Sequence, residues 1–181
     1  MHPSSKENMK RARKIVEDKF GAYEKGQTIL DFGGRDRNHK VNNVSGYTEI
    51  WKDVYKDYFV SDLQPGDNVT HVMSGPYELP FEDNSLDIIL SGQTFEHVHN
   101  PFRAAAELRR VLKPGKFMYI IAPSAGPTHD NPDCWRFYRD SFKAIAKECN
   151  LKVIADWIDN GKEWEERSAR WKDHTFVGQK I

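Results

Sequence analysis

The sequence lacks several features that would define its class. Its 181 residues include only two cysteines, Cys134 and Cys149, whose separation suits neither a disulfide framework nor a zinc motif. The 27 lysines and arginines balance the 27 aspartates and glutamates, so the composition gives no charged surface for nucleic acid or membrane. No apolar run is as long as a membrane-spanning helix, and the first residues lack the apolar centre of a secretion signal. These absences favour a globular, cytoplasmic protein.

Strand-like and helix-like patterns alternate along the chain. Short β-prone runs predict strands at 27–32, 57–63, 69–74, 86–92, 116–124, 151–159 and 174–181, of which 69–74 is the weakest. Helical spacing and turn signals predict helices at 4–26, 47–55, 100–112 and 139–150. Such alternation predicts an α/β fold with a mostly parallel sheet covered by helices, and ligands at the carboxyl ends of the strands.

A carboxylate and two glycines lie where the first strand is expected to end. Asp31 precedes Gly33 and Gly34, and glycine lets a ligand approach the backbone because no Cβ intervenes. A dinucleotide site needs a third glycine for its pyrophosphate, which is absent here. An adenosine with an amino-acid tail needs only the close approach, and Asp62, at the end of the next strand, can accept both hydroxyls of its ribose. The alternative is that the glycine pair is only a turn.

Three segments together resemble one family. ILDFGGRD (29–36), LPFEDNSLDIILSGQTFEHVHNP (79–101) and AELRRVLKPGKFMYIIAPS (106–124) resemble motifs of class I S-adenosylmethionine-dependent methyltransferases of the type 11 domain group. The segment HDNPDCWRFY (129–138) resembles a subgroup associated with surface-sugar metabolism. The resemblance implies a Rossmann-like, mostly parallel seven-stranded sheet with helices on both faces and a C-terminal antiparallel strand pair. It also implies S-adenosylmethionine as cofactor and S-adenosylhomocysteine as product.

The resemblance also implies how the chain is organised. One methyltransferase domain, 1–181, would comprise an N-terminal helix (1–26), a cofactor-binding core (28–124), a substrate-facing loop (125–140) and a closing strand pair (151–181). Asp31 would bind the amino group of the methionine tail, Gly33 would contact that tail, and Asp62 would hold the ribose. The implied cofactor-binding residues are Asp31, Gly33, Gly34, Arg35, Asp62, Leu63, Tyr77, Glu78, Ser91 and Gln93.

The sequence departs from the family pattern at three positions. Arg35 stands where many members have a glycine, so we expect it to reach the cofactor carboxylate. Gly75 stands where an acid often binds the adenine amine, which leaves that contact to backbone groups or to Glu78. Gln93 replaces a frequent acid.

Two histidines are candidate general bases for a hydroxyl acceptor. His97 follows the fourth strand of the core, where bracing the next helix is an equal alternative. His129 is preferred because it lies in a polar loop, where functional residues concentrate. Metal binding by His129, Asp130 and Asp133 is a weaker alternative because short acidic loops are common, so we assign no metal site.

The cluster DCWRFY provides candidates for acceptor binding. Aromatic side chains can stack on a sugar and arginine can bind an anion, so the substrate-binding candidates are Asp133, Trp135, Arg136 and Tyr138. The alternative is that Trp135 and Phe137 pack the loop onto the core while Arg136 pairs with Asp133.

The preferred function is methyl transfer to a small-molecule acceptor, as O-methylation of a sugar or related metabolite. One alternative is a catalytically degenerate methyltransferase-like domain that acts through a protein partner. A second is a nucleotide-binding dehydrogenase, which the missing third glycine disfavours. Nucleic-acid methylation is disfavoured by the charge balance. The charged run 162–173 is expected to be solvated, with a homodimer contact through Trp164 and Trp171 as its alternative.

Overall fold

The computed structural model describes residues 3–36, 46–160 and 169–181. Within these ranges seven strands form one sheet in the order β3-β2-β1-β4-β5-β7-β6. The strands are β1 (Gln27–Phe32), β2 (Tyr55–Asp62), β3 (His71–Val72), β4 (Leu86–Gly92), β5 (Leu112–Pro123), β6 (Leu151–Ile158) and β7 (Asp173–Lys180). Among the described strands β7 runs antiparallel to both of its neighbours, β5 and β6, and all the other neighbouring strands pair in parallel. This sheet confirms the predicted fold class.

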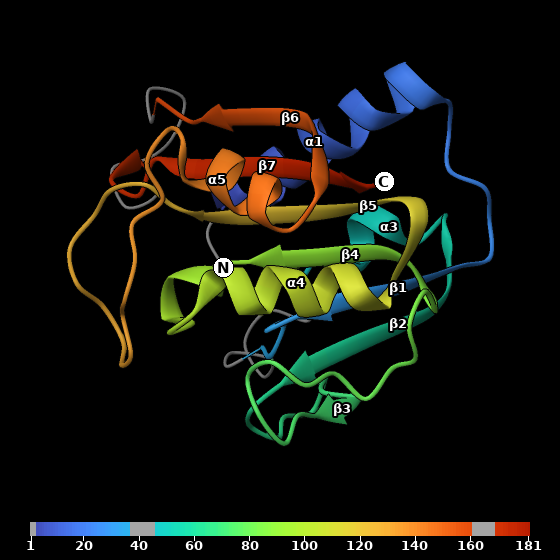
Figure 1. Ribbon diagram of the computed structural model, residues 1–181, viewed down its shortest axis with the longest axis horizontal. Coiled ribbons are helices and arrows are strands. Elements are labelled where there is room, and N and C mark those ends of the chain that lie inside the picture. The colour runs from blue at the N-terminus through green and yellow to red at the C-terminus, as the bar shows by residue number, and fades with distance from the viewer. Residues whose placement is uncertain (1–2, 37–45, 161–168) are drawn as a thin grey trace.

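Helices cover both faces of the sheet (Figure 1). They are α1 (Pro3–Phe20), α3 (Thr48–Trp51), α4 (Pro101–Val111) and α5 (Ser141–Glu148), with a 3₁₀ turn, η1, at Phe95–His97. In the view of Figure 1, α4 and α5 lie in front of the sheet and α1 lies behind it. No helix in the described ranges is both long and apolar enough to cross a membrane.

The core has two halves because successive strand residues point to opposite faces of the sheet. Leu30 packs with Leu108 of α4 and Phe142 of α5, whereas Ile29 packs with Met9 of α1 and Trp51 of α3. Strands β1 and β4 lie at the centre and pair in parallel. From β1 the chain proceeds to β2 on one side and later to β4 on the other, so a topological switch point lies at their carboxyl ends. These ends are on the left in Figure 1.

Some element boundaries differ from those predicted. The first helix ends at Phe20 instead of reaching residue 26, because Gly21 adopts φ +91° there. The third strand is only two residues long. The fifth strand starts at Leu112, earlier than predicted, because Leu112 already pairs with Leu86. Trp164 lies outside the described residues. Trp171 is 3% exposed within its own chain and so offers little surface for an oligomer contact, and the homodimer stays a prediction.

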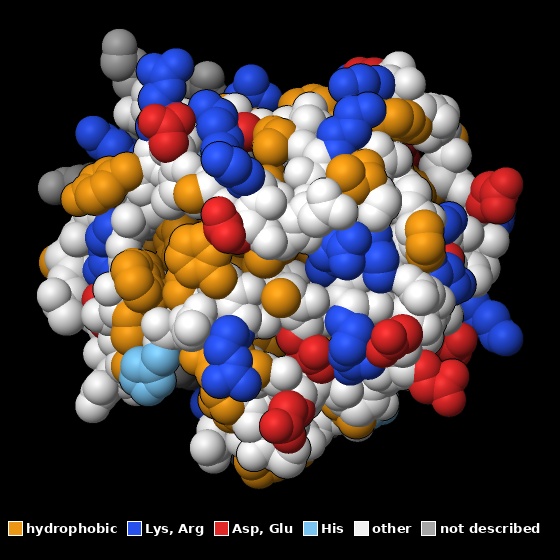
Figure 2. Space-filling view, in the orientation of Figure 1, with side chains coloured by type: hydrophobic (Ala, Val, Ile, Leu, Met, Phe, Trp, Pro, Cys, Tyr) orange, Lys and Arg blue, Asp and Glu red, His pale blue; other side chains and the backbone are white. Residues whose placement is uncertain are grey.

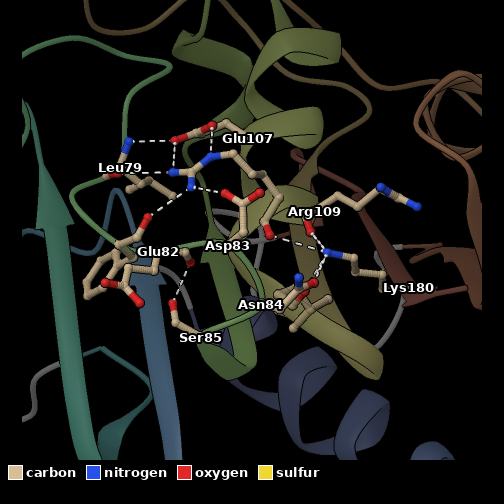
Figure 3. A network of polar contacts seen from close by, with 11 residues as sticks. Leu79, Glu82, Asp83, Asn84, Ser85, Glu107, Arg109 and Lys180 are labelled. Carbon is tan, nitrogen blue, oxygen red and sulfur yellow. Dashed lines mark hydrogen bonds and ion pairs between the residues drawn. The ribbon is translucent and has the colours of Figure 1, made fainter.

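A polar network closes the C-terminal end of α4 at the opposite edge of the sheet (Figure 3). The Lys180 amino group donates to the backbone carbonyls of Arg109 and Leu112 and to Asn84 Oδ1, each at 2.7 Å. The Arg110 guanidinium binds Asp83, Glu107 and the backbone carbonyls of Leu79 and Phe81. We call this set of residues the α4 network. It satisfies carbonyls that the end of a helix leaves without partners.

Candidate functional site

Asp31 lies at the carboxyl end of β1 and is 1% exposed. Its Oδ2 accepts a hydrogen bond from the Tyr58 hydroxyl at 2.9 Å, whereas Oδ1 has no hydrogen-bond partner among the described residues. Burial raises the pKa of this carboxyl to about 7. A pocket of about 330 Å³ lies against it, lined by Asp31, Gly46, Thr48, Tyr55, Tyr58, Val60 and Asn68. Asp31 therefore offers a buried acceptor that a positively charged group would satisfy.

The glycine pair after β1 is required by close packing. Gly33 has φ +71°, and a Cβ on it would lie 2.2 Å from Thr94 Cγ2. A Cβ on Gly34 would lie 2.6 Å from Asp31 Cγ. Neither position has room for a larger residue. The two glycines thus bring the ends of β1 and β4 together beside Asp31.

Asp62 ends β2, next to Asp31, as the sequence predicted. Its Oδ1 accepts a hydrogen bond from the Gln64 backbone amide and lies 3.6 Å from Arg35 Nε. Asn68 connects the two loops, since its Nδ2 donates to the Gly34 carbonyl at 2.8 Å. Arg35 is therefore directed at the carboxylate expected to hold the ribose, and its expected contact with a cofactor carboxylate stays a prediction.

The other predicted cofactor residues have varied surroundings. Leu63 is 46% exposed beside Asp62, and Glu78 is exposed on its loop. The Tyr77 hydroxyl accepts a hydrogen bond from the Asn100 backbone amide. Ser91 is fully buried and donates to the Phe32 carbonyl, which joins β4 to β1. Their roles toward a cofactor stay predictions.

Gln93 is anchored by a residue that sequence reasoning missed. It adopts φ +57°, and its Nε2 donates to Asp173 Oδ1 at 2.9 Å. Asp173 is 1% exposed and also accepts from the Ser4 hydroxyl of α1. Burial raises the pKa of its carboxyl. The first turn of α1 and the start of β7 thereby support the loop after β4, a contact between distant segments that no local pattern announces.

Glu96 of η1 is a second buried acid that the sequence did not single out. It is 0% exposed, and neither carboxylate oxygen has a hydrogen-bond partner among the described residues. Burial raises the pKa of this carboxyl to about 8. The sequence does carry a signal for this residue, because Glu96 lies among the apolar residues of FEHV (95–98). An acid that such a pattern buries fully usually has a specific role.

The two predicted histidines lie together beside Glu96. The rings of His97 and His129 are 5.0 Å apart between centroids, and His97 Nε2 is 3.6 Å from Glu96 Oε1. His129 also lies 4.6 Å from the ring of Trp171, and desolvation lowers the pKa of this histidine. The structure therefore brings the end of β4 and the loop after β5 into one group, Glu96, His97 and His129, which we call the η1 cluster.

The loop after β5 is held to η1 and to itself. The backbone amides of Cys134 and Trp135 both donate to the Glu96 carbonyl oxygen. Arg136 forms a bidentate ion pair with Asp133 at 2.6 and 2.8 Å and donates to the Pro127 carbonyl. This ion pair keeps the pKa of the Asp133 carboxyl well below its usual range.

The four predicted substrate-binding residues divide into two kinds. Asp133 and Arg136 bind each other, which is the pairing that the sequence left as an alternative. Trp135 is 42% exposed and Tyr138 71%, so both present apolar surface, while Phe137 is buried in the core. A role in acceptor binding stays a prediction for all four.

The chain is similar to known proteins in sequence. A family model described as a methyltransferase domain matches residues 47–120, downstream of the glycine pair. An uncharacterized methyltransferase from Mycobacterium avium is 32% identical over 93 residues, which are 50% of this chain and 37% of the relative. The chain thus spans little more than a third of that relative's length.

Solved structures share the fold at low sequence identity. A SAM-dependent methyltransferase from Aquifex aeolicus superposes with a TM-score of 0.65 at 18% identity, over 99% of this chain and 94% of that one. The 1,6-didemethyltoxoflavin-N1-methyltransferase of Burkholderia thailandensis, solved with 1,6-didemethyltoxoflavin and S-adenosylhomocysteine, gives 0.67 at 13% identity, over 98% and 80% of the two chains. The sheet order, the motifs and these likenesses agree with the resemblance to methyltransferases, and the solved structures share the fold of this chain. Residues 47–120 thus match a methyltransferase domain, and the fold of the chain is similar to that of S-adenosylmethionine-dependent methyltransferases of known structure.

Proposed function

We propose that this chain binds S-adenosylmethionine at the carboxyl ends of β1, β2 and β4 and methylates a hydroxyl group of a small molecule, such as a sugar or related metabolite. The observation that carries the proposal is the pair of carboxylates, Asp31 and Asp62, at the ends of adjacent strands, with no hydrogen-bond partner for Asp31 Oδ1 in the described part of the chain. The sulfonium of the cofactor supplies an already activated methyl group. The protein can therefore supply much of the rate enhancement by holding the acceptor in the correct position.

The residues of this edge suit the parts of the cofactor differently. Asp31 can accept hydrogen bonds from the ammonium group of the methionine tail, which would supply its missing partner. Asp62 suits the ribose hydroxyls once the Arg35 side chain, which lies 3.6 Å from its Oδ1, turns away. Leu63, exposed beside Asp62, offers an apolar surface for the adenine.

The acceptor is expected on the side of the loop after β5. Figure 2 shows apolar side chains gathered on the left of the near face, over the N-terminal part of α4. The exposed Trp135 and Tyr138 lie in this loop, and aromatic rings can stack on the apolar face of a sugar. His129, whose pKa is lowered, suits a general base that stays neutral near pH 7.

One observation favours the alternative of a degenerate domain that acts through a protein partner. Arg35 replaces a glycine of the family pattern and lies against Asp62. A guanidinium in that place competes with the ribose hydroxyls for the same carboxylate. If Arg35 stays there, the chain keeps the fold without the cofactor.

Calorimetric titration separates the two functions. S-adenosylmethionine and S-adenosylhomocysteine should bind wild-type protein with micromolar affinity, while NAD, the control, should not bind. Asp62→Ala should weaken binding at least tenfold without unfolding the protein, and Arg35→Ala should retain or strengthen it. No binding by wild type together with binding by Arg35→Ala would favour the degenerate domain. Unchanged affinity in Asp62→Ala would contradict the placement of the ribose at this strand end.

A further inference from the structure

We propose that Glu96, His97 and His129 form a site for one divalent transition metal ion of the Zn²⁺ type. Each of the three residues offers one ligand atom, and these atoms all lie within 4.8 Å of one another. Two imidazoles and one carboxylate are a common ligand set of mononuclear catalytic zinc sites, where a fourth position stays open. The sequence motifs do not predict an ion at this position.

The spacing suits a small ion. Ligand atoms about 2.0–2.1 Å from Zn²⁺ at tetrahedral angles are about 3.3 Å from each other. The separation of His97 Nε2 and Glu96 Oε1 is 3.6 Å, close to that value. The third corner belongs to His129, whose side chain is 29% exposed and whose ligand atom lies within 4.8 Å of the other two.

Hydrogen bonding fixes the ring of His97 in the orientation that a metal ligand needs. Its Nδ1 lies 2.6 Å from the Pro132 carbonyl oxygen, which can only accept, so Nδ1 carries the proton. The neutral ring therefore keeps its free lone pair on Nε2, the nitrogen that faces Glu96. A histidine that ligates a metal typically donates its other ring N–H to a carbonyl or carboxylate in this way.

His129 has a carboxylate beside it on the other side of the cluster. The Asp133 Oδ2 atom lies 3.4 Å from His129 Nδ1 and accepts a hydrogen bond from the His129 backbone amide. The bidentate ion pair with Arg136 holds Asp133 in place and keeps it ionised. Asp133 and Arg136 then orient a metal ligand, which gives this tightly bonded pair a purpose that direct acceptor binding would not.

The buried Glu96 carboxylate is the independent observation that points to a ligand. Both oxygens are shielded from solvent, and no described residue donates to either of them. Burying a carboxylate without partners is costly, and a cation is one of the few partners that offset this cost fully. The cluster also has an accessible side, because the His97 and His129 side chains are 21% and 29% exposed. An ion can therefore enter from solvent.

An ion at this place would deepen the proposed function, on which this step rests. The η1 cluster follows β4 and faces the loop after β5, the side expected to receive the acceptor. The open position of the ion would take a hydroxyl oxygen of the acceptor and make its proton more acidic. His129 would then hold the ion, and this role replaces the general-base role proposed for it above. The ion would thereby select acceptors with a hydroxyl group that can coordinate it.

The test is metal binding by the purified chain after treatment with a chelator. Zn²⁺, measured in competition with a chromophoric chelator, should bind with one equivalent per chain. Co²⁺ should give the visible absorption of a four- or five-coordinate ion with nitrogen and oxygen ligands. Glu96→Gln, which preserves shape, and His97→Ala and His129→Ala should each weaken Zn²⁺ affinity at least 100-fold. His99→Ala is the matched control, because this exposed histidine lies two residues from His97 and should leave affinity unchanged.

Two readouts keep this inference separate from the proposed function. Absence of stoichiometric Zn²⁺ binding by wild type, or equal affinity in Glu96→Gln and wild type, would overturn the metal site even if S-adenosylmethionine binds. Stoichiometric Zn²⁺ with no cofactor binding would keep the metal site and overturn the methyltransferase function. Thermal unfolding of each variant confirms that a lost site is not a lost fold.

Discussion

The α4 network and the η1 cluster lie at opposite ends of the strands of the same sheet. They differ in how their charged groups are paired. In the α4 network the Lys180 amino group donates to three carbonyls and an amide oxygen, and each carboxylate of the network accepts from Arg110 (Figure 3). In the η1 cluster the Glu96 carboxylate is fully buried and has no donor among the described residues. Satisfied polar groups stabilise a fold, whereas buried polar groups without partners leave binding capacity for a ligand. The comparison teaches that, of these two groups, the one at the carboxyl ends of the strands holds the unsatisfied acid.

The largest effect is expected from breaking the α4 network. Lys180→Met removes the ammonium group that donates to the carbonyls of Arg109 and Leu112, whereas the Arg110 carbonyl keeps the Asn84 amide as a donor. We expect the free energy of unfolding to fall by about 3 kcal/mol, or the melting temperature by about 6–12 °C. Thermal and urea unfolding measure this loss. Lys152→Met on the exposed edge strand is the control, and equal losses in both variants would refute a special role for the network.

In the η1 cluster we expect a substitution to change the free energy of unfolding in the opposite direction. Glu96→Leu replaces a buried carboxyl without partners by an apolar side chain of similar size, so the free energy of unfolding should rise by about 1–2 kcal/mol in metal-free protein. Urea unfolding in the presence of a chelator measures the gain. A loss of stability would show that Glu96 has a partner in solution and would end the contrast between the two edges.

A smaller effect should appear in the pH dependence of stability. The pKa of Asp31 is raised by burial to about 7, so its protonated form is favoured by folding. The stability that this group contributes is complete at low pH and is lost as pH rises through about 7. Between pH 6 and 8, wild type should lose about 1 kcal/mol relative to Asp31→Asn. Urea unfolding of both proteins at each pH checks this difference, and parallel curves would contradict it.

Much of the fold was predictable because burial on both faces leaves a clear apolar pattern. The central strands β1, β4 and β5 occur where their apolar runs predicted them, as does α4, which begins with Asn100 as an N-cap and Pro101 in its first turn. The third strand, which was predicted weakly, is only two residues long, because a short edge strand depends on its single neighbour. Boundaries such as the end of α1 were set by backbone conformation at one glycine.

The site was predictable where chemistry and position coincide. Asp31, Asp62, His97 and His129 could be selected because each polar side chain follows a strand of the predicted sheet. Which of these residues lie together depended on tertiary contacts between segments far apart in sequence. Asp173 is the clearest example, because the contacts that bury it come from Ser4 and Gln93, far from it in the chain.

The contact between Ser4 and Asp173 has a practical consequence for handling the protein. The first turn of α1 supports the Gln93 loop through Asp173, so bulk attached at the start of the chain would press on the working edge of the sheet. Ile181 is 61% exposed and follows β7 at the other edge. Affinity tags, fluorophores and surface immobilisation are therefore better placed after Ile181, away from Asp31 and from the η1 cluster.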